Sequence, residues 1–572
     1  MKKPNEMVDP APIRSSKSAM GILFLALTLA FMVSCKWIFP VTYKTLSGSH
    51  IWLSASTIKF VNHWLSESPQ ELHFVNFESP DSIEFNSSVE RGPYISYPSG
   101  ETFFVYCFAK LAGHSRIDLS FLKHLQLWCF WSEILLFALF VYRFLSRNGV
   151  ASEMEKTITA FSTALFWSWL PANTWYLENV FFADQCIILF VMAFLLVEYE
   201  GMHCTRKTCR FTINAAKSLL IFAGVMIDYY FWILAFVAFI MHLLRTMRAK
   251  EGWANLVSQS LWYVVPVIVA LTAFACQLMS IPNWDNLLAD RFFLRAGLSP
   301  CEDNALRGIL INLKIHFTSS FGLTKSGFLR SLVLFAVLVF ELGMGTMKNT
   351  CRRILSRFPK WVFGKNGTII VLGFVSPLLQ IALLRNHSAM HEFSMLKLAW
   401  CVAMVPVLVP LMLLRAKGFS RQCFAGNAKY SFFFHGFVLC MGAMIVITNI
   451  PFSSRDFYLS RQQYSSHLEH SRIAEILRNN TSREHVCFSF SVEIPENPPH
   501  ALAISGKRVY KINALKELDA HFPNLALGAK KLLVIDKNAT DLTNEQLAEQ
   551  RMLVSDKPVF YEDDWFCLLL LE

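Results

Sequence analysis

The stretch GILFLALTLAFMV at residues 21–33 decides the class of fold, because Thr28 is its only polar side chain. Basic residues precede it, as they precede a signal sequence: Lys2, Lys3, Arg14 and Lys17. The Cys35-Lys36-Trp37 that follows offers no small-x-small cleavage site. We therefore interpret the stretch as a retained signal anchor within a membrane span near residues 19–41.

Similar apolar runs recur along the chain. Hydrophobic residues make up 54% of the sequence, more than a soluble protein of this length would bury. A bilayer core takes about 20 apolar residues per helix, so we predict an all-α polytopic membrane protein with about eleven spans. The runs lie near residues 19–41, 119–143, 157–176, 182–199, 212–227, 229–246, 258–280, 328–346, 368–384, 394–415 and 431–449. The two runs that meet at Asp228 also allow one long broken helix.

The net charge of +11 comes from Lys and Arg residues between the apolar runs, where they set the membrane orientation. It therefore does not indicate a nucleic-acid partner. Lys and Arg gather in alternate segments, whereas residues 177–181, 227–230 and 385–393 together carry only Arg385. By the positive-inside rule, the N-terminal segment 1–18 lies in the cytoplasm and everything after Ile450 lies outside. We expect an integral protein of the plasma membrane, of the bacterial inner-membrane kind.

Polar segments divide the chain into domains. The membrane domain covers residues 19–450, with a first outer loop at 42–118 and a second at 282–327. Amphipathic stretches in these loops predict helices that lie at the membrane interface: His50–Leu65, Tyr97–Ala112 and Asn304–Phe317. Residues 451–572 form a predicted small α/β domain. Its expected helices are Arg461–Asn479, Ala514–Ala520 and Asn544–Glu549, and its expected strands are Val486–Val492, Arg508–Ile512, Lys531–Ile535 and Trp565–Leu571.

Polar residues near the outer ends of the spans are the candidates for a site. Tyr97-Pro98-Ser99-Gly100 is a turn that opens a helix at the membrane face. Asp184 lies at the mouth of a span, where a carboxylate indicates either a function or a helix N-cap. His387 and His391 would stand one helical turn apart, and with Arg385 they could clamp a phosphate or bind a metal. A plain polar loop is the alternative.

The chain contains no Walker loop, no Gly-rich dinucleotide turn and no Gly-x-Ser-x-Gly elbow, so no nucleotide site is expected on the cytoplasmic side. Its layout instead resembles the C-type glycosyltransferases, which include protein O-mannosyltransferases, aminoarabinose transferases and bacterial lipopolysaccharide sugar transferases. The motifs that carry the resemblance are Tyr97-Pro98-Ser99-Gly100, Asp184, a loose match at Arg116–Lys123, and Asn386–Phe393. They cover roughly the first 450 residues, and the tail resembles no family.

The resemblance implies a polyprenyl-phosphate sugar donor, an inverting transfer to a hydroxyl on the outer face, and a glycan, lipid or protein acceptor. Tyr97, Pro98 and Gly100 would position the donor lipid. Its phosphate would meet the basic side chains of the outer loops: Arg91, Arg385, His387 and His391. Asp184 would belong to the catalytic group.

One departure from the family concerns the general base. The family places an acid just after the first span, but here Ser47-Gly48-Ser49-His50 carries none. We predict that Glu84 is the base, with His50 and Asp81 as alternatives. Either acid can also hold a divalent cation against the donor phosphate. One rival function is a transporter or flippase of a lipid or polar solute, which the break at Asp228 favours. The other is an inactive scaffold, which the missing acid favours.

Overall fold

The computed structural model describes residues 17–37, 52–78, 92–148, 150, 152–170, 172–173, 176, 180–250, 252–296, 305–315, 364–416, 468–482, 484–491, 505–507, 509–518 and 530–571. The spans predicted near 328–346 and 431–449 lie outside these residues, as does the start of the predicted helix Arg461–Asn479, at residues 461–467. All the other predicted runs coincide with helices.

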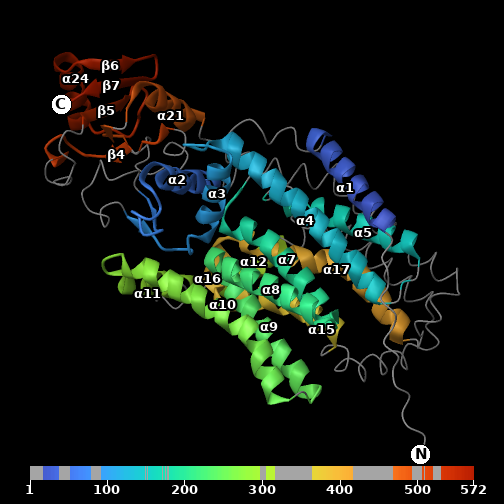
Figure 1. Cartoon of the computed structure of the whole chain (residues 1–572). Helices are drawn as coiled ribbons and strands as arrows, with labels where there is room; N and C mark the ends of the chain where they lie inside the picture. The colour runs from blue at the N-terminus through green and yellow to red at the C-terminus, as the bar shows by residue number, and fades with distance from the viewer. Residues whose placement is uncertain are drawn as a thin grey trace, which may run out of the picture.

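A bundle of long helices forms the body of the molecule (Figure 1). Within the described residues, 7 helices are long and apolar enough to cross a membrane. They are α1 (Lys17–Trp37), α4 (Leu119–Arg147), α7 (Ala183–His203), α8 (Lys207–Ile227), α9 (Tyr229–Arg248), α10 (Trp253–Met279) and α15 (Lys365–Leu383). The bundle also contains α5 (Glu153–Ser168) and α17 (Ala399–Ala416). The predicted class of fold, a polytopic all-α membrane protein, is confirmed.

The chain folds back sharply at Asp228, so α8 and α9 are two helices and not one broken span. Asp228 has extended backbone angles, φ −145° and ψ 139°, and its side chain caps α9 by accepting from the Tyr230 N–H at 2.8 Å. Gly224 permits the close approach, because a Cβ there would lie 2.4 Å from the Phe231 ring. The Trp232 Nε1–H also donates back to the Val225 carbonyl at 2.8 Å.

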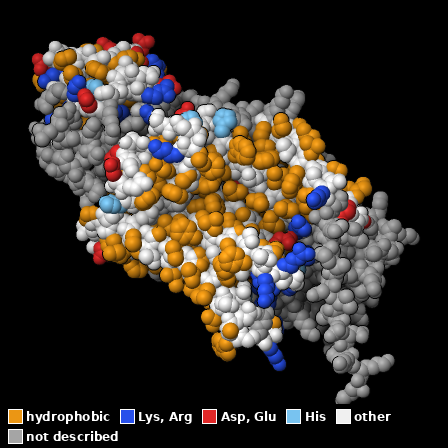
Figure 2. Space-filling view, viewed as in Figure 1, with side chains coloured by type: hydrophobic (Ala, Val, Ile, Leu, Met, Phe, Trp, Pro, Cys, Tyr) orange, Lys and Arg blue, Asp and Glu red, His pale blue; other side chains and the backbone are white. Residues whose placement is uncertain are grey.

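Hydrophobic side chains cover the flank of the bundle, and Lys and Arg gather toward one end of it (Figure 2). Large exposed apolar residues of the bundle come from α8, α9 and α10: Phe211, Leu219, Phe236, Leu261 and Ile268. Exposed basic residues lie in the α7–α8 and α9–α10 turns and in the helix ends that flank them: Arg206, Lys207, Arg210, Arg248 and Lys250. An apolar flank with one basic end is the surface expected of a protein that crosses a bilayer, since Lys and Arg are enriched in its cytoplasmic turns.

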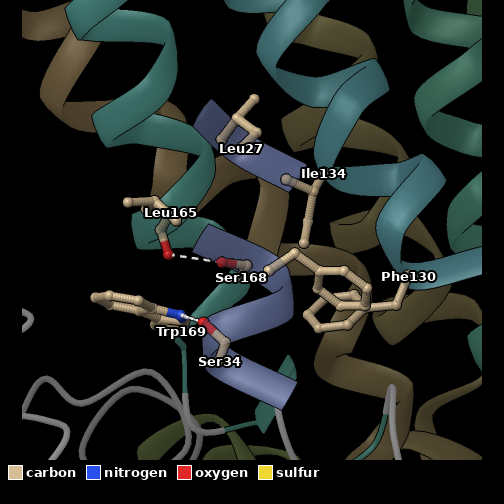
Figure 3. Close-up of a pocket in the computed structure, with 8 residues that line it drawn as sticks. Leu27, Ser34, Phe130, Ile134, Leu165, Ser168 and Trp169 are labelled. Atoms are coloured by element: carbon tan, nitrogen blue, oxygen red, sulfur yellow. Dashed lines mark hydrogen bonds between the residues drawn. The ribbon is translucent and has the colours of Figure 1, made fainter. Parts of the chain in front are cut away.

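A small pocket lies between α1, α4 and α5 (Figure 3). Its lining is mostly apolar, with Leu27, Phe130 and Leu165 among the residues. Its polar groups are already bonded within the protein. The Trp169 Nε1–H donates to Ser34 Oγ at 3.1 Å, and the Ser168 hydroxyl donates to the Leu165 carbonyl at 2.9 Å. The pocket therefore serves packing rather than chemistry.

Short helices cap the opposite end of the bundle from the basic turns (Figure 1). They are α2 (Trp52–Glu67), α3 (Gly100–Leu111), α11 (Trp284–Ala296), α12 (Ala305–Ile315), α16 (Arg385–Met390) and the 3₁₀ helix η3 (Glu392–Leu398). The amphipathic stretches of the two outer loops thus do form helices. The surface of α2 is mostly covered by protein, because its buried residues include Leu53, Phe60 and Trp64. A two-stranded pairing of β1 (Asn76–Phe77) with β2 (Pro93–Tyr94) joins α2 to α3.

The tail is a small α/β domain, as predicted. Its sheet has the order β4-β3-β5-β7-β6. The strands are β3 (His485–Ser489), β4 (Val509–Lys511), β5 (Lys530–Asp536), β6 (Val559–Glu562) and β7 (Phe566–Leu570). The first three strands are parallel and the last two pairings are antiparallel. Helix α21 (Leu468–Asn480) packs on one face and α24 (Asn544–Asp556) on the other. The domain lies beside α2 and α3 (Figure 1).

Candidate active site

Two acids and one lysine meet where three membrane helices begin. Asp184 lies in the first turn of α7, Asp228 caps α9, and Lys397 lies in the last turn of η3, just before α17. The Lys397 Nζ lies 2.7 Å from Asp184 Oδ1 and 2.8 Å from Asp228 Oδ2. The three side chains are at most 1% exposed. We call them the acid–lysine triad.

Tyr97 joins the triad to the segment after α15. Its hydroxyl donates to Asp184 Oδ2 at 2.6 Å, so both oxygens of Asp184 are engaged. The same hydroxyl lies 3.2 Å from His387 Nε2. The N-cap of α7 is Phe182 and has no side-chain bond, so Asp184 does not cap its own helix. The N-cap explanation of this acid is therefore wrong, and its oxygens hold Tyr97 and Lys397 instead.

Burial sets the protonation of the two groups that Tyr97 and His387 bring to the site. Desolvation and then the nearby Asp184 carboxylate raise the pKa of Tyr97 well above its usual value. Desolvation and then the Arg295 charge lower the pKa of His387 well below its usual value. Since the Tyr97 proton goes to Asp184, we assign the proton of the neutral imidazole to Nε2. The Nδ1 lone pair of His387 can then accept a hydrogen bond.

Arg295, near the end of α11, supplies a partly buried positive charge. Its guanidinium lies 4.4 Å from the centre of the Tyr97 ring and 5.7 Å from that of Tyr229. These two rings are stacked at 6.1 Å. One guanidinium nitrogen, Nη1, is buried without a hydrogen-bond partner, and among the described residues Arg295 has no ion pair. Such a group is prepared to receive an anion.

The remaining predicted residues lie around this centre. His387 and His391 stand together as predicted, with ring centres 4.8 Å apart. Arg385 Nε donates to the Ala296 carbonyl at 3.0 Å, which ties α16 to the end of α11 beside Arg295. Pro98 is buried between Tyr97 and α3. Gly100 starts α3 against the α8 backbone, because a Cβ there would lie 2.3 Å from the Met226 carbonyl oxygen.

Four predicted site residues lie outside the described part of the chain: His50, Asp81, Glu84 and Arg91. Their proximity to the triad stays a prediction. The nearest described acid of the same segment is Glu78, which forms an ion pair with the buried Lys59 of α2.

Sequence reasoning missed Lys397 and Arg295 as site residues. Lys397 had a usable signal, since it is a charged residue inside the apolar run at 394–415, where a charge is functional by default. Asp228 was noted only as a break between two runs. Arg295 gave no signal, because it is one of several charged residues in a polar loop. Only the fold places it over the Tyr97 ring.

Comparison with known proteins identifies the fold. No family profile and no curated protein matches the sequence. Among solved structures, ArnT from Cupriavidus metallidurans bound to undecaprenyl phosphate is similar over 97% of this chain and 98% of that one, with 10% identity and a TM-score of 0.53. Its apo form gives 11% identity and a TM-score of 0.48 over the same shares. The Archaeoglobus fulgidus oligosaccharyltransferase gives 14% identity and a TM-score of 0.46 over 91% of this chain and 70% of that one.

The chain thus has the fold of the C-type membrane glycosyltransferases, a class that includes the aminoarabinose transferase ArnT. The resemblance seen in the sequence is confirmed at the level of the fold. The likeness also extends beyond the first 450 residues, because it covers nearly the whole chain.

Proposed function

We propose that this protein is a membrane glycosyltransferase that moves a sugar from a polyprenyl-phosphate donor to a hydroxyl of an acceptor on the outer face. The observation that carries the proposal is the position of the acid–lysine triad and Arg295 at one end of an ArnT-type fold. The ArnT of that comparison was solved with undecaprenyl phosphate, which supports a lipid phosphate as the donor here. The acceptor is a glycan, a lipid or a protein.

Arg295 is the proposed anchor for the donor phosphate. Its buried Nη1 needs an acceptor, and its charge has no carboxylate partner among the described residues. A phosphate oxygen would accept from Nη1 and would balance the charge of Arg295. The lipid phosphate would then leave as an anion beside a fixed cation. Arg385, His391 and Arg91 are the proposed further donors to the phosphate. His387 was predicted from the sequence as another, but in the assigned tautomer its one N–H faces the Tyr97 hydroxyl oxygen, so we propose that it holds Tyr97 instead.

The transfer itself needs a base and a good leaving group. As the acceptor oxygen bonds to the anomeric carbon, its proton passes to the base while the bond from that carbon to the phosphate oxygen breaks. A single displacement of this kind inverts the anomeric centre. Glu84 is the proposed base, with His50 and Asp81 as alternatives. Asp184 acts through its neighbours, because its oxygens already hold Lys397 and Tyr97.

The test is sugar transfer from radiolabelled undecaprenyl-phosphate sugars by the purified protein, with Arg295→Ala as the variant. We expect a loss of about a hundredfold to a thousandfold, typical of removing one charge-stabilising group. Arg291→Ala is the matched control, because Arg291 lies one turn earlier on α11 and is exposed. Equal loss in both variants, or full activity in Arg295→Ala, would contradict the proposed phosphate anchor.

The feature that favoured a transporter now has another explanation. The break at Asp228 is a tight turn whose acid caps α9 and pairs with Lys397. It therefore does not require a broken helix at the midplane of a transport path.

A further inference from the structure

Lys397 occupies the space between two buried carboxylates that come from different helices. The oxygens of Asp184 and Asp228 approach the same nitrogen at 2.7 and 2.8 Å. Carboxylates that converge in this way are the usual ligands of Mg²⁺, Mn²⁺ and Ca²⁺, which bind oxygen at about 2.0–2.6 Å. Here the converging point already holds a nitrogen that carries its own positive charge.

A divalent ion would fit this pair poorly. It would have to displace the ammonium, and the displaced charge would be left buried without a partner, which is costly. The described residues contain no group of three or more His, Cys, Asp and Glu side chains that could hold a metal. The second oxygen of Asp184 is also unavailable, since it accepts from Tyr97.

We propose that Lys397 is the resident cation of this site and that the Asp184–Asp228 pair takes no divalent metal ion. The lysine balances the acids, so that the triad together with Arg295 is formally neutral before the donor arrives. Without it, the two carboxylates would repel an incoming phosphate. Lys397 is thus a positioning residue that keeps the acids ionised in place and Arg295 available for an anion. The part that concerns the phosphate rests on the proposed function, whereas the part that concerns metal does not.

The first experiment measures Mn²⁺ binding to the purified, detergent-solubilised protein by electron paramagnetic resonance, which needs no turnover. We expect the same binding by the unmodified protein and by Asp184→Asn. Stoichiometric binding by the unmodified protein that Asp184→Asn abolishes would overturn the proposal. Since this comparison is independent of any donor, failure of the proposed transferase would leave its outcome intact.

The second experiment uses Lys397→Ala, which removes the ammonium and opens its space. We expect a lower melting temperature, and we expect Mn²⁺ to raise that temperature in the variant but not in the unmodified protein.

Lys397→Ala/Asp228→Asn should regain part of the lost melting temperature without Mn²⁺, because one buried acid is then neutral. If Lys397→Ala is as stable as the unmodified protein, or if removing the Asp228 charge lowers its stability further, the charge-balancing role is wrong. If Lys397→Ala does not fold, Lys397→Met takes its place. The melting temperature of Lys397→Met is then compared with that of Lys397→Met/Asp228→Asn.

Discussion

At the scale of single residues, Asp184 does its work through the two groups that its oxygens accept from. In Asp184→Asn one oxygen remains, so either the Tyr97 hydroxyl loses its carboxylate acceptor or the Lys397 ammonium keeps only Asp228. We expect transfer to be lost and the free energy of unfolding to fall by about 1–3 kcal/mol, the range for losing a buried hydrogen bond to a charged group. Denaturant unfolding in detergent measures this change.

The same residues give a double-mutant cycle. Tyr97→Phe combined with Asp184→Asn should lower the free energy of unfolding by less than the sum of the two single variants, because both changes remove the same hydrogen bond. We expect a coupling of about 0.5–3 kcal/mol. Tyr229→Phe is the matched control. Its ring stacks on Tyr97, but its hydroxyl points to the Ile95 carbonyl, so its effect should add to that of Asp184→Asn. Simple additivity of Tyr97→Phe would show that Asp184 and Tyr97 act separately.

At the scale of elements, Gly100 sets the contact between α3 and α8. A methyl group at this position would lie 2.3 Å from the Met226 carbonyl oxygen, two residues before Asp228. Gly100→Ala should therefore push α3 away and lower the free energy of unfolding by about 1–3 kcal/mol, as overpacking does. Gly21→Ala in α1 is the control, because nothing lies within 4 Å of a Cβ there. Equal melting temperatures for the two variants would contradict this packing.

Elements were predictable from the sequence where one physical signal dominates. Apolar runs of bilayer length gave α1, α4, α5, α7, α8, α9, α10, α15 and α17, because a helix satisfies the polar groups of its own backbone within lipid. Helix α11 was not predicted, since Trp284–Ala296 mixes charged and apolar residues without a strong pattern. Strand β6 was missed because it is a short, largely exposed edge strand.

The site was only partly predictable. Asp184, Tyr97 and His387 carry local signals, but the pairing of Lys397 with Asp228 depends on contacts between distant helices.

At the scale of the whole molecule, α3 and α16, which flank the candidate site, and the tail lie at the same end of the bundle, opposite the basic turns (Figure 1). The Lys and Arg distribution predicts that this end faces outward. An impermeant maleimide should therefore label Ser555→Cys, exposed on α24, in intact cells. It should reach the native, exposed Cys209 in the first turn of α8 only after lysis. Mass spectrometry of the labelled peptides distinguishes the two positions. The reverse pattern would place the tail and the site in the cytoplasm.

The order of the triad along the chain has a consequence for biosynthesis. The ribosome makes Asp184 and Asp228 well before Lys397, so both acids reach the membrane ahead of the lysine that balances them. Until then, burying them as ions would be costly, and they must stay hydrated or take up protons. The heads of α7 and α9 can therefore settle only after the segment that precedes α17 has been synthesised. Assembly of this end of the protein is a late event, and a chain that stops before residue 397 lacks the means to complete it.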